Sequence, residues 1–282
     1  MPAFRRPILL AAATCLLVGC GDNQTIIDRD AYVSPEPEPL ACVPNLDGEI
    51  TEGELAAAIG VPVRYLVSPA GVTREINTVG STNEDDVLVW DLSTDLADDQ
   101  EVVVTPETIE GKWYAGSFPA DVFITPFDAG GRTESIGRLD DTGLYLHGLA
   151  SREESPPEGQ TLLVYDPPIT VLQFPIRPGS SYESTGTIAN GMLRGIPYAG
   201  SDTYEVAVDA TGQLDLPQLT FEQAHRVRTR VTVAPSVGAP QVQHQVSFFF
   251  ECFGEVARAT SQLDETDPFF AVASEVRRLG FR

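Results

Sequence analysis

The sequence has few of the side chains that are most used in catalysis. Its 282 residues include three histidines, four cysteines and one lysine. The histidines, His147, His225 and His244, lie in no H-E-x-x-H pattern, and no G-x-S-x-G stretch or glycine-rich phosphate loop occurs. We therefore expect a non-enzymatic protein without a cofactor. The alternative is a hydrolase whose Ser, His and carboxylate come together from distant positions.

Positive charge is also scarce. The chain has 41 acidic and 18 basic residues, and its formal net charge is -23. Removing residues 1–19 would delete Arg5 and Arg6 and no acid, so the remainder would carry about -25. A surface this acidic repels phosphate groups, so we expect no nucleic-acid partner.

The first twenty residues, MPAFRRPILLAAATCLLVGC, have the layout of a signal peptide. Arg5 and Arg6 precede an apolar run, residues 7–18, that is too short to span a bilayer comfortably. The stretch LVGC, which ends at Cys20, resembles the lipobox of bacterial lipoproteins. An ordinary secretory signal is the alternative.

The lipobox resemblance implies a processed and lipidated protein. It makes residues 1–19 the signal peptide and Cys20 the first mature residue, which carries a diacylglycerol and usually an N-acyl chain such as palmitate. Two acyl signals suffice for stable anchoring to a membrane. Gly21 stands where such lipoproteins carry an inner-membrane retention aspartate, so the resemblance implies the outer membrane of the cell envelope. The side of that membrane stays open.

Cys42 and Cys252 remain for the mature chain. In an oxidising compartment such a pair predicts a disulfide. It would close a loop of 211 residues (252 - 42 + 1), which the chain-entropy relation makes worth roughly 5 kcal/mol. Two free thiols or a metal-binding pair are the alternatives.

The chain divides into three parts by composition. Residues 1–19 are the signal peptide, residues 20–41 form an acidic Pro/Glu-rich tether, and residues 42–282 form a single β-rich domain. In the last part, residues 51–59 are the clearest helix candidate, because Thr51 and Glu54 form a capping box and Gly60 follows.

Short alternating runs separated by Gly, Pro, Asn or Asp dominate the rest of the sequence and predict strands. We expect strands over residues 63–67, 86–92, 101–105, 112–118, 121–127, 143–150, 161–166, 169–176, 181–189, 203–212, 225–234 and 241–261, with a break near Gly254. Residues 269–282 fit a strand or a short helix, and we favour a strand. The fold class is therefore mainly β, an antiparallel sandwich or half-barrel-like sheet with one short N-terminal helix.

An arginine row stands out among these strands. Arg226, Arg228 and Arg230 alternate with Val227, Thr229 and Val231, which places the guanidinium groups on one face. We expect them to pair with carboxylates of neighbouring strands. Binding of an anionic ligand is the alternative.

The stretch PNLDGEITEGEL, residues 44–55, resembles the second half of an EF-hand calcium loop. Aligning Gly48 with the invariant glycine makes Asn45, Asp47 and Glu54 the candidate calcium ligands. Position one, normally Asp, is Val43, which removes an anionic ligand. The favoured interpretation is a turn followed by a capped helix.

Two apolar stretches suggest a ligand. In FFFECF, Phe248 and Phe250 share one face and Phe249 points to the other, so a curved sheet could cover an apolar ligand. LVYDPPITVLQFPIRPGSSY and FFFECFGEVARATS are similar to segments of uncharacterised β-rich envelope lipoproteins. We expect a lipid-anchored envelope protein with a structural or binding role, and a carrier of a lipid or other apolar ligand is the alternative.

Overall fold

The computed structural model describes residues 42–55, 58–128 and 130–281, and Ala41–Arg282 form one compact unit. The predicted signal peptide, Cys20 and the predicted tether lie outside the described residues. Within the described part, regular structure is almost entirely strand, with only the helix α1 (Glu52–Leu55) and the 3-10 turn η1 (Ala115–Ser117) besides. The expected fold class, mainly β with antiparallel pairing, is confirmed.

The strands belong to one sheet. They are β1 Val63–Val67, β2 Arg74–Glu75, β3 Ser81–Thr82, β4 Leu88–Asp91, β5 Gln100–Val104, β6 Glu107–Thr108, β7 Phe123–Pro126, β8 Thr133–Asp140, β9 Gly143–Ser151, β10 Leu162–Gln173, β11 Ser181–Leu193, β12 Ile196–Asp215, β13 Thr220–Pro235, β14 Gln241–Phe250, β15 Gly254–Ser261 and β16 Val272–Leu279.

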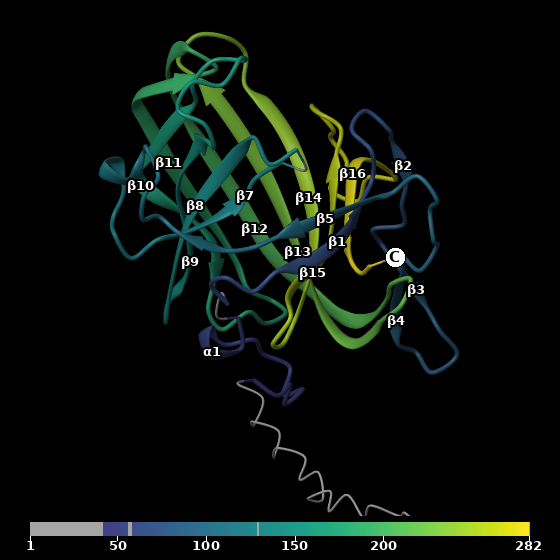
Figure 1. Ribbon diagram of the computed structural model, residues 1–282. Coiled ribbons are helices and arrows are strands. Elements are labelled where there is room, and N and C mark those ends of the chain that lie inside the picture. Colours follow the sequence, from purple (N-terminus) through teal and green to yellow (C-terminus); the bar gives the residue numbers. More distant parts are fainter. Residues whose placement is uncertain (1–41, 56–57, 129, 282) are drawn as a thin grey trace, which may run out of the picture. The chain divides into compact units, whose positions relative to one another are not determined.

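The sheet is open and strongly curved. Its order is β5-β1-β16-β15-β14-β13-β12-β11-β10-β9-β8-β7-β6, with β2, β3 and β4 as side branches. Pairing is antiparallel except between β4 and β12. β1 and β5 swing round and pass in front of β12 and β13 (Figure 1). The two ends of the strand order therefore face each other across the concave side of the sheet, which we call the cavity face.

The opposite side of β12 to β16 is the outer face. β4 and its flanking loops cover part of it, and Trp90 packs on Phe248 with ring centroids 4.9 Å apart. Phe250 lies in the same cluster, whereas Phe249 packs on the cavity face with Ile50 and other apolar side chains. The predicted alternation of the three phenylalanines is confirmed, because successive strand residues point to opposite faces.

Most predicted strands are present, but several predictions are wrong. The runs predicted at 161–166 and 169–176 belong to one strand, β10; β8 was not expected; and residues 112–118 form a covering loop with η1 instead of a strand. That loop is fixed by Tyr114, whose hydroxyl donates to Glu134 over 2.5 Å. Helix α1 spans only four residues, and Ile59 and Gly60 already form a turn.

Candidate functional site

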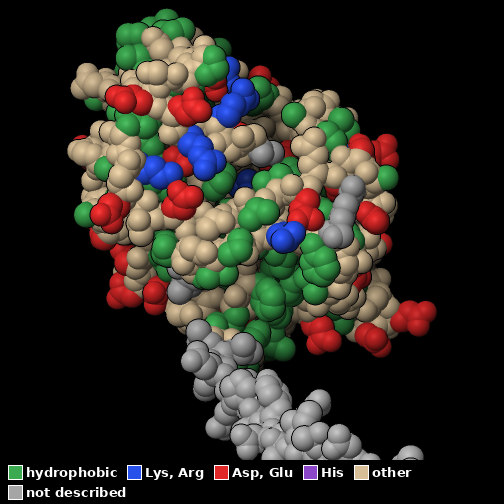
Figure 2. Space-filling model, in the orientation of Figure 1, with side chains coloured by type: hydrophobic (Ala, Val, Ile, Leu, Met, Phe, Trp, Pro, Cys, Tyr) green, Lys and Arg blue, Asp and Glu red, His purple; other side chains and the backbone are tan. Residues whose placement is uncertain are grey.

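A cavity of about 500 Å³ lies on the cavity face. Its walls come from β1 and β5 near one edge of the sheet, from β7 to β9 near the other, and from β10, β12 and β14 to β16 between them. In the space-filling view this side of the molecule is hollowed just above β5, with hydrophobic side chains around the hollow (Figure 2). Curvature of the sheet thus creates a space that its own side chains leave unfilled.

Most of the cavity wall is apolar. Phe123, Leu144, Leu146, Val171 and Phe249 line it from four different strands. These residue types give an environment that favours hydrocarbon over water.

Apolar side chains also reach solvent among the lining residues. Val61, Phe127 and Phe253 are 51%, 46% and 50% exposed. Val61 and Phe127 would lose contact with water if an apolar molecule occupied the cavity, whereas the Phe253 ring packs against Phe221 and Phe250 of the outer-face cluster. The cavity therefore has an apolar rim as well as apolar walls.

A charged cluster occupies the part of the wall made by β15 and β16. Arg258 and Arg277 are directly opposite each other in this strand pair, and both line the cavity. Like charges in that position destabilise a sheet. Glu255 offsets part of this cost, because it forms an ion pair with Arg277 and accepts a hydrogen bond of 3.0 Å from Ser247.

The two arginines differ in how well they are held. Arg277 stacks over the Tyr65 ring at 4.8 Å and pairs with Glu255. Arg258 approaches carboxylate oxygens of Glu255 and Glu275 only at 3.9 and 3.8 Å, beyond hydrogen-bond length. The buried Nε atoms of both arginines have no hydrogen-bond partner among the described residues, so the difference lies in their terminal guanidinium nitrogens.

The pKa shifts of Arg277 and Arg258 also differ. Burial opposes the charge of Arg277, but Glu255, Tyr65 and Glu275 together outweigh it and raise the pKa of Arg277 above its usual value. Burial likewise opposes ionisation of Glu255, yet Arg258 and Arg277 lower the pKa of this carboxyl. The pKa of Arg258 is lowered by burial and then by the charge of Arg277. Arg258 is thus the cation whose surroundings compensate it least.

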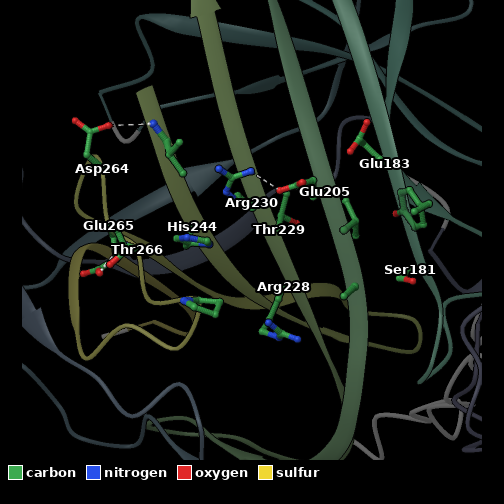
Figure 3. A pocket seen from close by; sticks show the side chains of 15 residues that line it. Ser181, Glu183, Glu205, Arg228, Thr229, Arg230, His244, Asp264, Glu265 and Thr266 are labelled. Atoms are coloured by element: carbon green, nitrogen blue, oxygen red, sulfur yellow. Dashed lines mark hydrogen bonds and ion pairs between the residues drawn. The ribbon is translucent and has the colours of Figure 1, made fainter. Parts of the chain in front are cut away.

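A larger depression of about 740 Å³ lies on the outer face of β11 to β14 (Figure 3). Arg228, Arg230, His244 and Glu205 line it, with the loop around Glu265 at its side. The predicted pairing of the arginine row with carboxylates is confirmed. Arg230 contacts Glu205 at 2.6 Å, and Arg226 and Arg228 share Asp209.

The three histidines are dispersed over the molecule. Each has a pKa lowered chiefly by burial. His225 contacts the Thr211 hydroxyl at 3.3 Å, and its Nε2 and that of His147 have no partner among the described residues. His244 lines the outer depression. Among the described residues, no hydrogen bond joins a histidine ring to a serine or a carboxylate.

The proposed calcium ligands form a network of their own. Glu54 accepts hydrogen bonds from the amide side chain of Asn45 at 2.9 Å and from the Thr51 backbone and hydroxyl. The Asn45 side-chain oxygen accepts from the Asp47 backbone N–H. This is a turn followed by one half of a capping box, because the Glu54 backbone N–H donates to the Thr51 carbonyl and not to the Thr51 hydroxyl. The described residues contain no group of three or more His, Cys, Asp or Glu that could hold a metal ion, and the calcium hypothesis stays a prediction.

The N-terminal segment, residues 42–55, is fastened beneath the cavity face. Cys42 and Cys252 form the expected disulfide, with Cα atoms 5.6 Å apart. The buried Glu251 carboxylate accepts the backbone N–H groups of Asn45 and Leu46 at 2.6 and 2.9 Å. Ile50 then pairs with Ile176. These contacts close one end of the cavity face.

Sequence reasoning overlooked the charged wall of the cavity. The signal was present in two strands, where Glu255, Arg258 and Arg277 stand among β-branched and small residues. Recognising it required knowing that these positions face the concave side. Periodicity gives the alternation of faces but does not say which face is enclosed.

No known protein family matches the chain, and neither a curated protein nor a solved structure is significantly similar to it. In the described part of the chain no helix is long and apolar enough to cross a membrane.

Proposed function

We propose that this protein is a lipid-anchored envelope protein that binds an apolar ligand in the cavity of its curved sheet. The observation that carries the proposal is the cavity itself, about 500 Å³ in volume and lined by apolar side chains from both ends of the strand order. Ligand sites in proteins have about 300–1,000 Å³ and similar linings.

The way the two faces are packed supports this function. On the outer face, β4 and its loops bury large aromatic rings such as Trp90 and Phe248 almost completely. Among the residues that line the cavity, Val61 and Phe127 remain about half exposed. Leaving apolar side chains in contact with water costs about 25 cal/mol per Å², a cost that a bound ligand would remove.

The test is binding of the neutral fluorophore N-phenylnaphthylamine to the full chain. We expect a saturable fluorescence increase with one site per chain. Val171→Trp, on β10, would fill the cavity and should weaken binding at least about tenfold. Val164→Trp is the matched control, because Val164 lies on the same strand, outside the cavity lining and 36% exposed.

The result would overturn the proposal if the wild-type chain gave no saturable signal, or if both tryptophan variants bound equally well. Circular dichroism and thermal unfolding would show that the variants fold.

The anchor is a separate part of the proposal and has its own test. Cys20→Ser should abolish incorporation of a palmitate analogue and release the protein from membranes. Retained labelling of this variant would refute the lipid anchor and leave the cavity proposal untouched.

A further inference from the structure

We propose that the ligand of the cavity is a fatty acid, with its carboxylate at Arg258 and its hydrocarbon chain along the apolar wall. This inference rests on the function proposed above and adds the chemical class of the ligand. It depends on the polar part of the cavity, which a purely apolar ligand would leave unused.

The placement of Arg258 is the first argument. It faces Arg277 directly across the β15–β16 pair, an arrangement that costs stability. The Arg258 side chain retains 21% of its accessible surface, whereas neighbouring Ala257 and Ala259 point to the other face of the strand and are fully buried. A guanidinium group in this position therefore faces the cavity and can reach a molecule inside it.

Unused hydrogen-bonding capacity is the second argument. Arg277 is engaged by Glu255 and by the Tyr65 ring. The contacts of Arg258 with Glu255 and Glu275 are 3.9 and 3.8 Å long. A carboxylate could accept two parallel hydrogen bonds from this planar group, which is the geometry that arginine provides best.

Tyr204 supplies a second donor. It lines the same cavity from β12, and no hydrogen bond joins its hydroxyl to another described residue. Burial raises the pKa of Tyr204, as does Asp202, while the charge of Arg258 lowers it in part. Tyr204 is thus a protonated hydroxyl close enough to Arg258 to interact with its charge. A neutral donor beside a cation suits a carboxylate with two oxygens.

The rest of the lining suits a single hydrocarbon chain. A twelve-carbon fatty acid fills about 400 Å³, if each non-hydrogen atom takes roughly the 30 Å³ of a water molecule in the liquid. The cavity has about 500 Å³. Its lining beyond the charged cluster includes Phe123, Leu144 and Val171, which offer no hydrogen bond to a second polar group.

The experiment compares dodecanoate with dodecanol as competitors of N-phenylnaphthylamine on the full chain at neutral pH. The two competitors share a chain and differ in the head group. We expect dodecanoate to bind at least about tenfold more tightly, because a hydrogen bond to a charged group is worth more than a neutral one. Arg258→Gln should reduce this preference to about twofold or less.

Arg64→Gln is the matched control. It also removes one positive charge from a strand, but Arg64 is exposed, pairs with Glu101 and does not line the cavity. It should keep the full preference. If Arg258→Gln fails to fold, Tyr204→Phe replaces it and should lower the preference about threefold or more.

The outcomes separate the two proposals. If fluorophore and both competitors bind but dodecanoate and dodecanol bind equally, the fatty-acid inference is overturned and the apolar-ligand function stands. If neither fluorophore nor competitor binds, both fail. A preference for dodecanoate that survives both Arg258→Gln and Tyr204→Phe would also overturn the inference, because the carboxylate would then lie elsewhere.

Discussion

An arginine on each face of the sheet differs in how fully its guanidinium group is hydrogen-bonded. On the outer face, Arg278 is 3% exposed and donates to the backbone carbonyls of Leu92 and Thr94 at 2.7 and 2.6 Å and to Asp99 at 2.5 Å. On the cavity face, Arg258 makes only long contacts with two carboxylates. Arg278 holds a loop on the sheet, whereas Arg258 has terminal guanidinium nitrogens that could still donate hydrogen bonds to a ligand.

Sequence position alone does not distinguish these roles. Arg277 and Arg278 are adjacent, and the alternation of the strand sends them to opposite faces. The difference comes from what covers each face. Loops whose carbonyl groups accept hydrogen bonds from Arg278 cover this part of the outer face, whereas the cavity face is only partly filled. A charge with so few close partners is costly to bury, which supports the binding role proposed for Arg258.

Removing the disulfide should have the largest effect on stability. It links the N-terminal segment to the end of β14, and with it the closed end of the cavity face. Cys42→Ser combined with Cys252→Ser should lower the free energy of unfolding by roughly 5 kcal/mol, because the loop in the unfolded chain is long. Chemical denaturation measures this loss, and reduced wild-type protein serves as the control. An unchanged free energy would show that the covalent link contributes nothing.

Replacing Arg278 and Arg258 in turn compares what each arginine contributes to the free energy of unfolding. Arg278→Met should cost about 3 kcal/mol, because the buried Asp99 would be left with Arg74 at 3.1 Å and the carbonyls of Leu92 and Thr94 would lose their donor. Arg258→Met should change the free energy of unfolding by less than about 1 kcal/mol, since it loses no close hydrogen bond and relieves repulsion by Arg277. Equal losses for the two variants, measured by denaturation, would contradict the assignment of different roles.

The phenylalanine pair compares the packing of the faces. Phe248 is 1% exposed and packs against Trp90, whereas Phe249 borders the cavity. Phe248→Ala should cost about 3–5 kcal/mol and Phe249→Ala about 2 kcal/mol less, because a ring beside empty space has fewer atoms in contact. Thermal and chemical unfolding of the two variants provide the measurement. A larger loss for Phe249→Ala would mean that the cavity face is the better packed of the two.

The pH dependence contributed by His225 should be the smallest effect. This side chain is fully buried on the cavity face, where burial lowers its pKa despite the nearby charges of Glu251 and Asp47. In the unfolded chain it takes up a proton below about pH 6.5, whereas the folded protein resists this uptake until lower pH. Stability should therefore fall as the pH drops below about 6.5.

His225→Gln isolates this contribution. The variant should lose part of the slope of unfolding free energy against pH between about 6.5 and the lower folded-state pKa, and should match the slope of the wild type above pH 7. The same slope in both proteins below pH 6.5 would exclude His225 as the origin.

Much of the fold was predictable because the local patterns are strong. β1 spans the predicted residues 63–67, and the strand favoured over the helix for the C-terminal segment is present as β16. β8 was missed because TESIGRLD is mostly polar, and its buried Glu134 is tolerated only through Lys112 and Tyr114. The alternation of residues along a strand does not show that a distant loop supplies partners for a buried carboxylate.

The candidate site was less predictable than the fold. The phenylalanine pattern predicted the possibility of an apolar ligand. The disulfide was predictable because Cys42 and Cys252 were the only cysteines left after the predicted signal peptide and lipid anchor, and it is present. The cavity depends on how far the sheet curves, which results from the summed twist of many strands. The role proposed for Arg258 could not be predicted without that curvature, because Tyr204 on β12 and Arg277 on β16 are distant from it in sequence.

The central claim is that a fatty acid occupies the cavity with its carboxylate at Arg258. The most direct measurement is a crystal structure of the protein with dodecanoate that carries bromine on its last carbon. Our account predicts an anomalous bromine signal among the apolar lining near Phe123 or Leu144, and carboxylate oxygens within hydrogen-bond distance of Arg258. A bromine signal beside Arg258, or a ligand bound outside the cavity, would contradict it.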